Sequence, residues 1–141
     1  MIAYFDTSAI VPLLVHEPST DVCNRVWNES TRAVSVRLLY PEARAALAKA
    51  ERMGRLTKRQ LRDAVTELDV IVTEINLIEV TPELAFNAGE LAETHGLRGY
   101  DAVHLAAAQS IADSELVLIT GDVNLASSAV RIGMNVSATS D

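Results

Sequence analysis

The chain of 141 residues has the length of one compact domain with one hydrophobic core. Its residues are 49% hydrophobic and 4% aromatic, a composition that favours a packed α/β domain and excludes a disordered chain. No apolar stretch approaches the roughly 20 residues that span a membrane, and Cys23 is the only cysteine, so no internal disulfide forms. We therefore expect a single domain over residues 1–141, a cytoplasmic location and no association with a membrane.

The net charge of −7 is unevenly distributed along the chain. Eight basic and two acidic residues lie between Arg37 and Arg62, so this segment carries +6 and the remainder of the chain −13. Such asymmetry indicates either a cationic surface that binds nucleic acid or simply a solvated helical hairpin. In the first case, the candidate contacts to phosphate groups include Arg44, Arg52, Lys58 and Arg59.

The sequence predicts strands and helices that alternate along the chain. In chain order we expect a strand at 2–5, a short helix carrying Ile10 to Leu14, a helix at 19–29, a strand at 33–36, helices at about 38–53 and 57–72, a strand at 75–80, helices at about 81–95 and 98–112, a strand at 116–119, a helix at 125–131 and a strand at 134–136.

Helix boundaries are the clearest of these signals. Thr81 followed by Pro82 is typical of a helix start, with threonine as the cap and proline in the first turn. Gly54 and Gly96 are typical of helix ends. We also expect Thr57 to cap a helix, and Thr7 and Ser8 to cap the short helix that follows the first strand.

Strands separated by helices imply βαβ crossovers and a mostly parallel sheet covered on both faces. The four-residue apolar run Leu116–Ile119 is typical of a strand buried on both faces. We therefore predict a single α/β/α sandwich with a central, mostly parallel sheet.

Four acidic residues stand where such a sheet would bring them together. Asp6 directly follows the first strand, Asp122 follows the strand at 116–119 by three residues, and both precede helices. Asp101 and Glu42 lie in the first turns of their helices. Glu42 shares the apolar stripe of its helix, so we expect it to point toward the sheet. Each residue also has a plain structural interpretation: Asp6 and Asp101 as helix caps, Asp122 as a turn residue and Glu42 as an exposed helix residue.

The combination of four carboxylates argues for a function. Converging carboxylates repel one another and require either raised pKa values or a counter-cation. A hard divalent ion, which prefers oxygen ligands, satisfies this requirement. The sequence therefore predicts a divalent cation held by Asp6, Glu42, Asp101 and Asp122.

Four motifs carry a resemblance to a known family. They are Phe5–Ala9 (FDTSA), Tyr40–Leu47 (YPEARAAL), Gly99–Ala106 (GYDAVHLA) and Ile119–Asp122 (ITGD). Their order and spacing resemble those of PIN-domain nucleases over essentially the whole chain, and more closely those of VapC-type toxins of prokaryotic toxin–antitoxin systems.

The resemblance implies roles for individual residues. Asp6 and Asp101 match the family's main Mg²⁺ or Mn²⁺ ligands, and Glu42 and Asp122 its other two acidic positions, so that all four are candidate catalytic residues. The hydroxyl groups of Thr7 and Thr120 are expected to orient carboxylates or water around the ion.

The resemblance also implies an activity and partners. The expected reaction is hydrolysis of RNA phosphodiesters by an endoribonuclease toxin. The expected partners are a small antitoxin protein that silences the enzyme and a second copy of the chain in a homodimer.

Three other interpretations stay open at this stage. A phosphotransfer enzyme would use Asp6 as a nucleophile, and a receiver-type signalling domain also gathers acids at strand ends. A binding module would keep the PIN-like fold without activity. For His104, one turn after Asp101, we expect packing or hydrogen bonding rather than metal ligation.

Overall fold

The structure is a computed structural model, and it describes residues 1–139. In this part of the chain the elements are β1 (Ile2–Phe5), α1 (Thr7–Leu14), α2 (Thr20–Glu29), β2 (Arg32–Val36), α3 (Leu39–Arg52), α4 (Lys58–Glu74), β3 (Asn76–Ile78), α5 (Pro82–His95), α6 (Gly99–Ser110), β4 (Leu116–Thr120), α7 (Val123–Arg131) and β5 (Asn135–Ala138).

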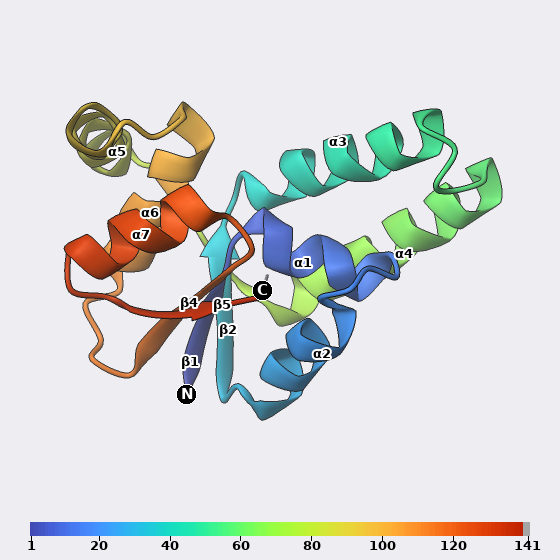
Figure 1. Ribbon diagram of the computed structural model, residues 1–141, viewed down its shortest axis with the longest axis horizontal. Helices are drawn as coiled ribbons and strands as arrows, with labels where there is room; N and C mark the ends of the chain where they lie inside the picture. Colours follow the sequence, from blue (N-terminus) through green and yellow to red (C-terminus); the bar gives the residue numbers. More distant parts are fainter. Residues whose placement is uncertain (140–141) are drawn as a thin grey trace.

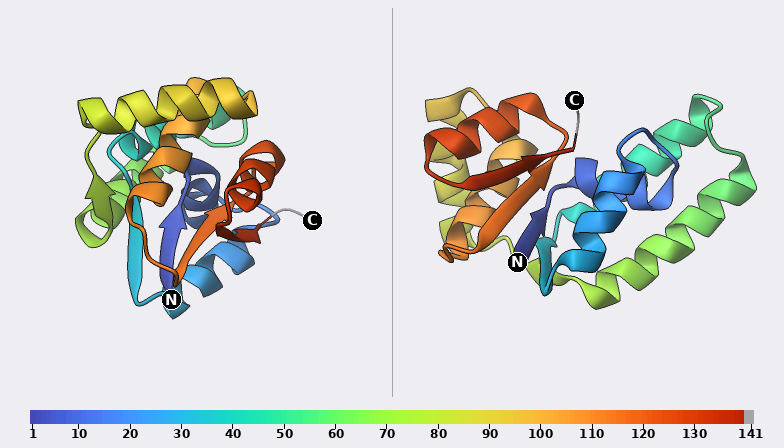
Figure 2. Two further views of the ribbon diagram at one scale, coloured as in Figure 1. Left: turned by 90° about the vertical axis from the view of Figure 1, so that its left-hand side faces the viewer. Right: turned by 60° about the horizontal axis from the view of Figure 1, so that its bottom comes forward.

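The strands form one sheet in the order β3-β2-β1-β4-β5, and every neighbouring pair is parallel. Helices α1 to α4 lie on one face of this sheet and α5 to α7 on the other (Figures 1 and 2). This is the predicted α/β/α sandwich, and the fold class is confirmed.

The hydrophobic core has two halves, one on each face of the sheet. Alternation along β1 sends the side chains of Ala3 and Phe5 toward α1 to α4 and that of Tyr4 toward α5 to α7. All three residues have no exposed surface, as expected for a central strand covered on both faces. The end of β1 is therefore rigidly placed, and the chain leaves it at Asp6.

Most predicted boundaries agree with the structure. Thr57 caps α4 in a capping box with Gln60, and Thr81 caps α5 by accepting a hydrogen bond from the Leu84 amide. Gly96, with φ of 64°, ends α5 in the left-handed conformation that glycine adopts without strain.

Three boundary predictions were wrong. The expected strand at 75–80 pairs only over Asn76–Ile78, because the chain then turns into the cap of α5, with the Thr81 amide donating to the Glu79 carbonyl. The last strand lies at 135–138 instead of 134–136. Thr7 and Ser8 do not cap α1, since they form its first turn and their hydroxyl groups bond to other carboxylates.

Helices α3 and α4 form a helical hairpin that extends beyond the edge of the sheet (Figure 1). The turn between them contains Gly54 with φ of 78°, and the buried residues Leu47 and Leu68 attach the hairpin to the core. The segment of net charge +6 covers α3 and the start of α4. None of the helices within residues 1–139 has the length and apolar character needed to cross a membrane.

Candidate active site

The candidate site lies at the carboxyl ends of β1 and β4, which are neighbouring strands of the sheet. The first and fourth acidic motifs lie at these ends. The register of the two strands pairs Phe5 with Ile119, and the Asp6 amide continues the ladder by donating to the Ile119 carbonyl at 3.2 Å. Asp6 and Thr120, which are 114 positions apart in the sequence, are thereby neighbours at one edge of the sheet. This is the edge at which open parallel sheets bind ligands.

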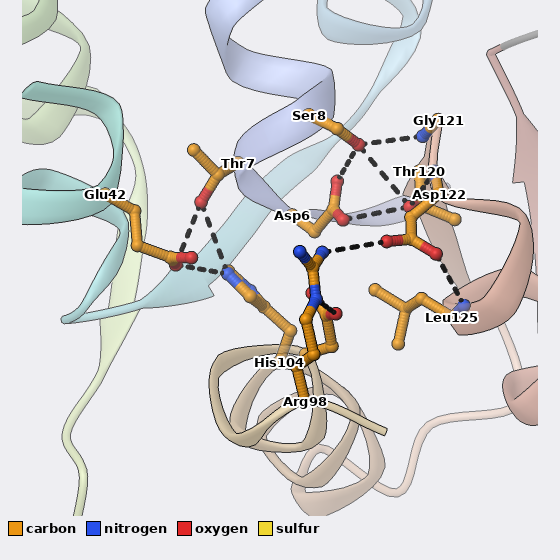
Figure 3. A network of polar contacts seen from close by, with 11 residues as sticks. Asp6, Thr7, Ser8, Glu42, Arg98, His104, Thr120, Gly121, Asp122 and Leu125 are labelled. Carbon is orange, nitrogen blue, oxygen red and sulfur yellow. Dashed lines mark hydrogen bonds and ion pairs between the residues drawn. The ribbon is translucent and has the colours of Figure 1, made fainter. Parts of the chain in front are cut away.

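Two hydroxyl groups hold the Asp6 carboxylate in place (Figure 3). Ser8 Oγ donates to Asp6 Oδ1 at 2.6 Å, and Thr120 Oγ1 donates to Asp6 Oδ2 at 2.9 Å. Those hydroxyl groups are themselves fixed by main-chain donors, since the Gly121 amide donates to Ser8 Oγ and the Asp122 amide to Thr120 Oγ1. Asp6 is only 4% exposed.

Burial is the main electrostatic influence on Asp6. It raises the pKa of this carboxyl group above its ordinary value, and the charge of Asp101 acts in the same direction. His104 and the hydroxyl groups of Ser8 and Thr120 lower the pKa and oppose this effect. A buried carboxylate with these surroundings is stabilised in its charged form by a nearby cation.

A second group of contacts surrounds Glu42, on the other side of β1 (Figure 3). Its Oε1 atom accepts a hydrogen bond from Thr7 Oγ1 at 3.0 Å and lies 2.7 Å from His104 Nε2. His104 Nδ1 in turn lies 2.9 Å from the hydroxyl group of Tyr4. Glu42 therefore points toward the sheet, as predicted, and its side chain is 22% exposed.

Arg98 joins the two remaining acidic residues. Its Nε atom lies 3.0 Å from Asp101 Oδ2, and its terminal nitrogen lies 3.5 Å from Asp122 Oδ2. The guanidinium group extends toward the Asp6 side of the site (Figure 3). Asp101 on α6 and Asp122 before α7 thus face one cation, although 21 positions separate them in the sequence.

The structure shows which of these acids have a structural role as helix caps. Asp122 is the cap of α7, since its Oδ1 accepts from the Leu125 amide at 3.0 Å, while its Oδ2 faces Arg98. Asp6 occupies the cap position of α1 without a capping hydrogen bond, and Asp101 lies inside the first turn of α6. The carboxylates of Asp6 and Asp101 therefore serve no helix cap.

The donor set fits a hard divalent cation in chemistry, because it consists of carboxylate and hydroxyl oxygens. The shared contact of Asp101 and Asp122 with one guanidinium group also indicates that a positive charge is accommodated between them. Within residues 1–139, however, no three histidine, cysteine or acidic side chains lie at the spacing of a preformed metal site. An ion bound between Asp101 and Asp122 would compete with the contacts that these carboxylates make with Arg98.

Sequence reasoning missed three participants in this site. Ser8 bridges Asp6 and Gly121, and its position two residues after Asp6 in the first motif was an available signal. Arg98 precedes Asp101 by three residues, the spacing at which helical neighbours pair. Tyr4 had no such signal, because its contact with His104 spans 100 positions.

The predicted phosphate contacts lie on the hairpin. Arg52, Lys58 and Arg59 are exposed around the turn between α3 and α4, whereas Arg44 lies nearer the sheet with its guanidinium 5.7 Å from the centre of the Tyr40 ring. Arg44 and Arg52 therefore lie on α3 and Lys58 and Arg59 on α4, and none of the four has a recorded contact with the four acidic residues.

Comparison with known proteins identifies the class of this fold and site. Residues 3–130 match the family profile described as PIN domain. The chain belongs to the PIN-domain family.

Relatives and solved structures agree with this assignment. Ribonuclease VapC49 of Mycobacterium tuberculosis is 40% identical over 136 residues, covering 96% of this chain and 94% of that protein. The structure of VapC20 from the same species, titled a sarcin-ricin loop cleaving toxin, aligns with a TM-score of 0.69 at 17% identity, over 94% of this chain and 95% of its own. A toxin–antitoxin complex from Klebsiella pneumoniae contains a chain that aligns with a TM-score of 0.66 at 18% identity, over 99% and 98% of the two chains.

Proposed function

We propose that this protein is a metal-dependent endoribonuclease that hydrolyses RNA phosphodiesters with the aid of Mg²⁺ or Mn²⁺. The observation that carries the proposal is that Asp101 and Asp122 share one cationic group, Arg98, at the carboxyl edge of the sheet where Asp6 follows β1. The names of the 40% identical relatives, which are ribonucleases, support the choice of RNA as substrate.

Asp6, Asp101, Glu42 and Asp122 are the residues that would hold the ion. When bound, a divalent cation neutralises charge on the phosphate and lowers the pKa of a coordinated water. Thr120 and Ser8 keep the Asp6 carboxylate in one orientation, and Thr7 does the same for Glu42. Glu42 or Asp122 would accept the proton of the attacking water.

RNA would be held by its backbone along the hairpin. Arg52, Lys58 and Arg59 are exposed. Contacts between these residues and phosphate groups would hold the RNA without reading its base sequence. Two other basic residues of the segment are already paired, Arg37 with Glu79 and Arg55 with Glu17. The unpaired charges of the hairpin turn are therefore the better candidates for contacts with phosphate.

The test is cleavage of RNA by the purified protein with Mg²⁺ or Mn²⁺, and with EDTA. We expect cleavage with either ion, products that carry 5′-phosphate and 3′-hydroxyl ends, and loss of cleavage in EDTA. Undiminished cleavage in EDTA would refute the role of the ion. Binding of RNA without cleavage under any of these conditions would favour an inactive PIN-fold binding module.

We further propose that the protein is the toxin of a toxin–antitoxin pair and forms a homodimer. The proposal is supported by the VapC names of its relatives and by the likeness to a chain solved in a toxin–antitoxin complex. A carboxylate-lined site offers an antitoxin a physical means of inhibition, since an inserted Arg or Lys would pair with the acids and compete with the ion. In this protein Arg98 already makes such contacts from within the chain.

A further inference from the structure

A buried chain of polar contacts connects the sheet to Glu42. It runs from the Tyr4 hydroxyl group on β1 to His104 Nδ1 at 2.9 Å, and from His104 Nε2 on α6 to Glu42 Oε1 on α3 at 2.7 Å. Tyr4 has no exposed surface and His104 is 2% exposed. The strand β1 and the helices α6 and α3 thus meet in one network, and Figure 3 shows the part of it between His104 and Glu42.

The chemistry of Glu42 sets the direction of these hydrogen bonds. A carboxylate only accepts, so His104 Nε2 must carry the proton that it donates to Oε1. Nδ1 meets the Tyr4 hydroxyl group, which donates to a neutral ring or accepts from a protonated one, so the contact exists in either state. Both ring nitrogens are engaged, which leaves neither for direct ligation of a metal.

The same Glu42 oxygen is held from a second direction. Thr7 Oγ1, in the first turn of α1, donates to Oε1 at 3.0 Å and lies 3.3 Å from His104 Nε2. Two donors from different elements therefore fix Oε1, and Oε2 has no hydrogen bond within the described residues, so it is available to an ion. The rings of Tyr4 and His104 also pack edge to face, with centroids 5.8 Å apart, so the imidazole has little freedom to turn.

We infer that His104 is a positioning residue which, anchored by Tyr4, orients the Glu42 carboxylate for the metal ion. This inference rests on the proposed function, because it gives Glu42 the role of a ligand. Partners of this kind around metal ligands contribute about 10- to 100-fold to metal affinity. If the imidazole only filled space, an apolar side chain of similar volume would replace it without effect on the ion.

The test is calorimetric titration of the protein with Mn²⁺ alone, without RNA. His104→Leu fills the cavity but removes the donor, and we expect it to weaken Mn²⁺ binding by about 10- to 100-fold. His104→Gln retains an N–H donor and should recover part of the affinity. Leu105→Val is the control, since this neighbour is fully buried on the same helix and should leave the affinity for Mn²⁺ unchanged.

A double-mutant cycle distinguishes positioning from a general structural effect. In a Glu42→Gln background, His104→Leu should cause little further loss, because its effect acts through the carboxylate that has been removed. Equal losses in both backgrounds, or wild-type affinity in His104→Leu, would overturn the inference. Absence of Mn²⁺ binding by the wild-type protein would instead overturn the proposed metal site, and the inference with it.

If His104→Leu fails to fold, the variant Tyr4→Phe provides a second test of the positioning role. This change removes one hydroxyl group and preserves the ring packing against His104. We expect a smaller loss of Mn²⁺ affinity in the same direction, with circular dichroism unchanged. A Tyr4→Phe protein that binds Mn²⁺ as tightly as the wild type would contradict the anchoring role of Tyr4.

Discussion

At the scale of single residues, the candidate site combines burial with charge. Asp6 is 4% exposed, and its charged form depends on two hydroxyl donors and on nearby positive charge. Such a group costs stability in the folded protein and is tolerated where it serves a function. The costs should therefore appear in the stability of variants, independently of any measurement of activity.

We expect Asp6→Asn to stabilise the metal-free protein at neutral pH. Because the pKa of Asp6 is raised by burial in the folded state, the wild type loses stability as pH rises from the ordinary carboxyl pKa through the raised one. The difference in melting temperature between Asp6→Asn and the wild type in EDTA should therefore be larger at about pH 7 than at about pH 4. Asp63→Asn, at an exposed position on α4, is the control. A less stable Asp6→Asn protein at neutral pH would refute this description of Asp6.

Arg98 provides a second prediction at this scale. Its side chain is 83% exposed, and its guanidinium group shares Asp101 and Asp122 with the proposed ion. Since the two cations compete, Arg98→Ala should tighten binding of Mn²⁺, by about two- to fivefold for an exposed pair. Arg131→Ala, an exposed change of equal charge, should have no such effect. Weaker Mn²⁺ binding in Arg98→Ala would show that the arginine supports the site instead of competing for it.

At the scale of elements, the α3–α4 hairpin is the proposed surface for an RNA backbone. We expect the triple change Arg52, Lys58 and Arg59 to Ala to weaken RNA binding. Each lost phosphate contact should lower the slope of log affinity against log salt by about 0.7–0.9. The matched control replaces Arg25, Arg32 and Arg131, three exposed basic residues outside the hairpin. Equal slopes for the two triple variants would mean that the hairpin is only a solvated surface.

The elements also show how far sequence alone can lead. Helix ends were predictable where a single side chain decides them, as with Thr57, Thr81 and Gly96. The length of the edge strand β3 was overestimated because the alternation of apolar residues continues from Ile78 to Val80, whereas pairing with β2 ends at Ile78. The local sequence pattern indicates the propensity of a segment to form a strand. How far that strand pairs with its neighbour is determined by the tertiary structure.

In the candidate site, too, the positions of some residues were predictable from the sequence, whereas their contacts were not. Asp6 and Asp122 were predictable as neighbours because parallel strands end at one edge, and Glu42 was correctly expected to face the sheet. The networks that orient them were not predictable, since Tyr4–His104 and Thr120–Asp6 connect residues at least 100 positions apart. The ligand roles of the four acids stay predictions.

At the scale of the whole molecule, the proposal concerns a toxin and its inhibitor. Expression of the chain alone should arrest growth of the host, whereas expression of Asp6→Asn should not, because the arrest depends on nuclease activity. Co-expression with the proposed antitoxin should restore growth and yield a complex that co-purifies. A wild-type chain that is harmless at high level and elutes as a monomer would contradict both the toxin and the homodimer, even if the nuclease activity persists.

The most direct test of the central claim is the rate of RNA cleavage by Asp101→Asn in saturating Mn²⁺. Asp101 lies in the first turn of α6 and caps no helix, so its replacement removes the charge of a proposed ligand with little effect on folding. Glu90→Gln, at an exposed position on α5, is the matched control. We predict a loss of at least about 100-fold in Asp101→Asn, as for removal of one group that stabilises transition-state charge, and wild-type rates in Glu90→Gln. Equal rates in all three proteins would contradict the assignment of this edge of the sheet as the active site.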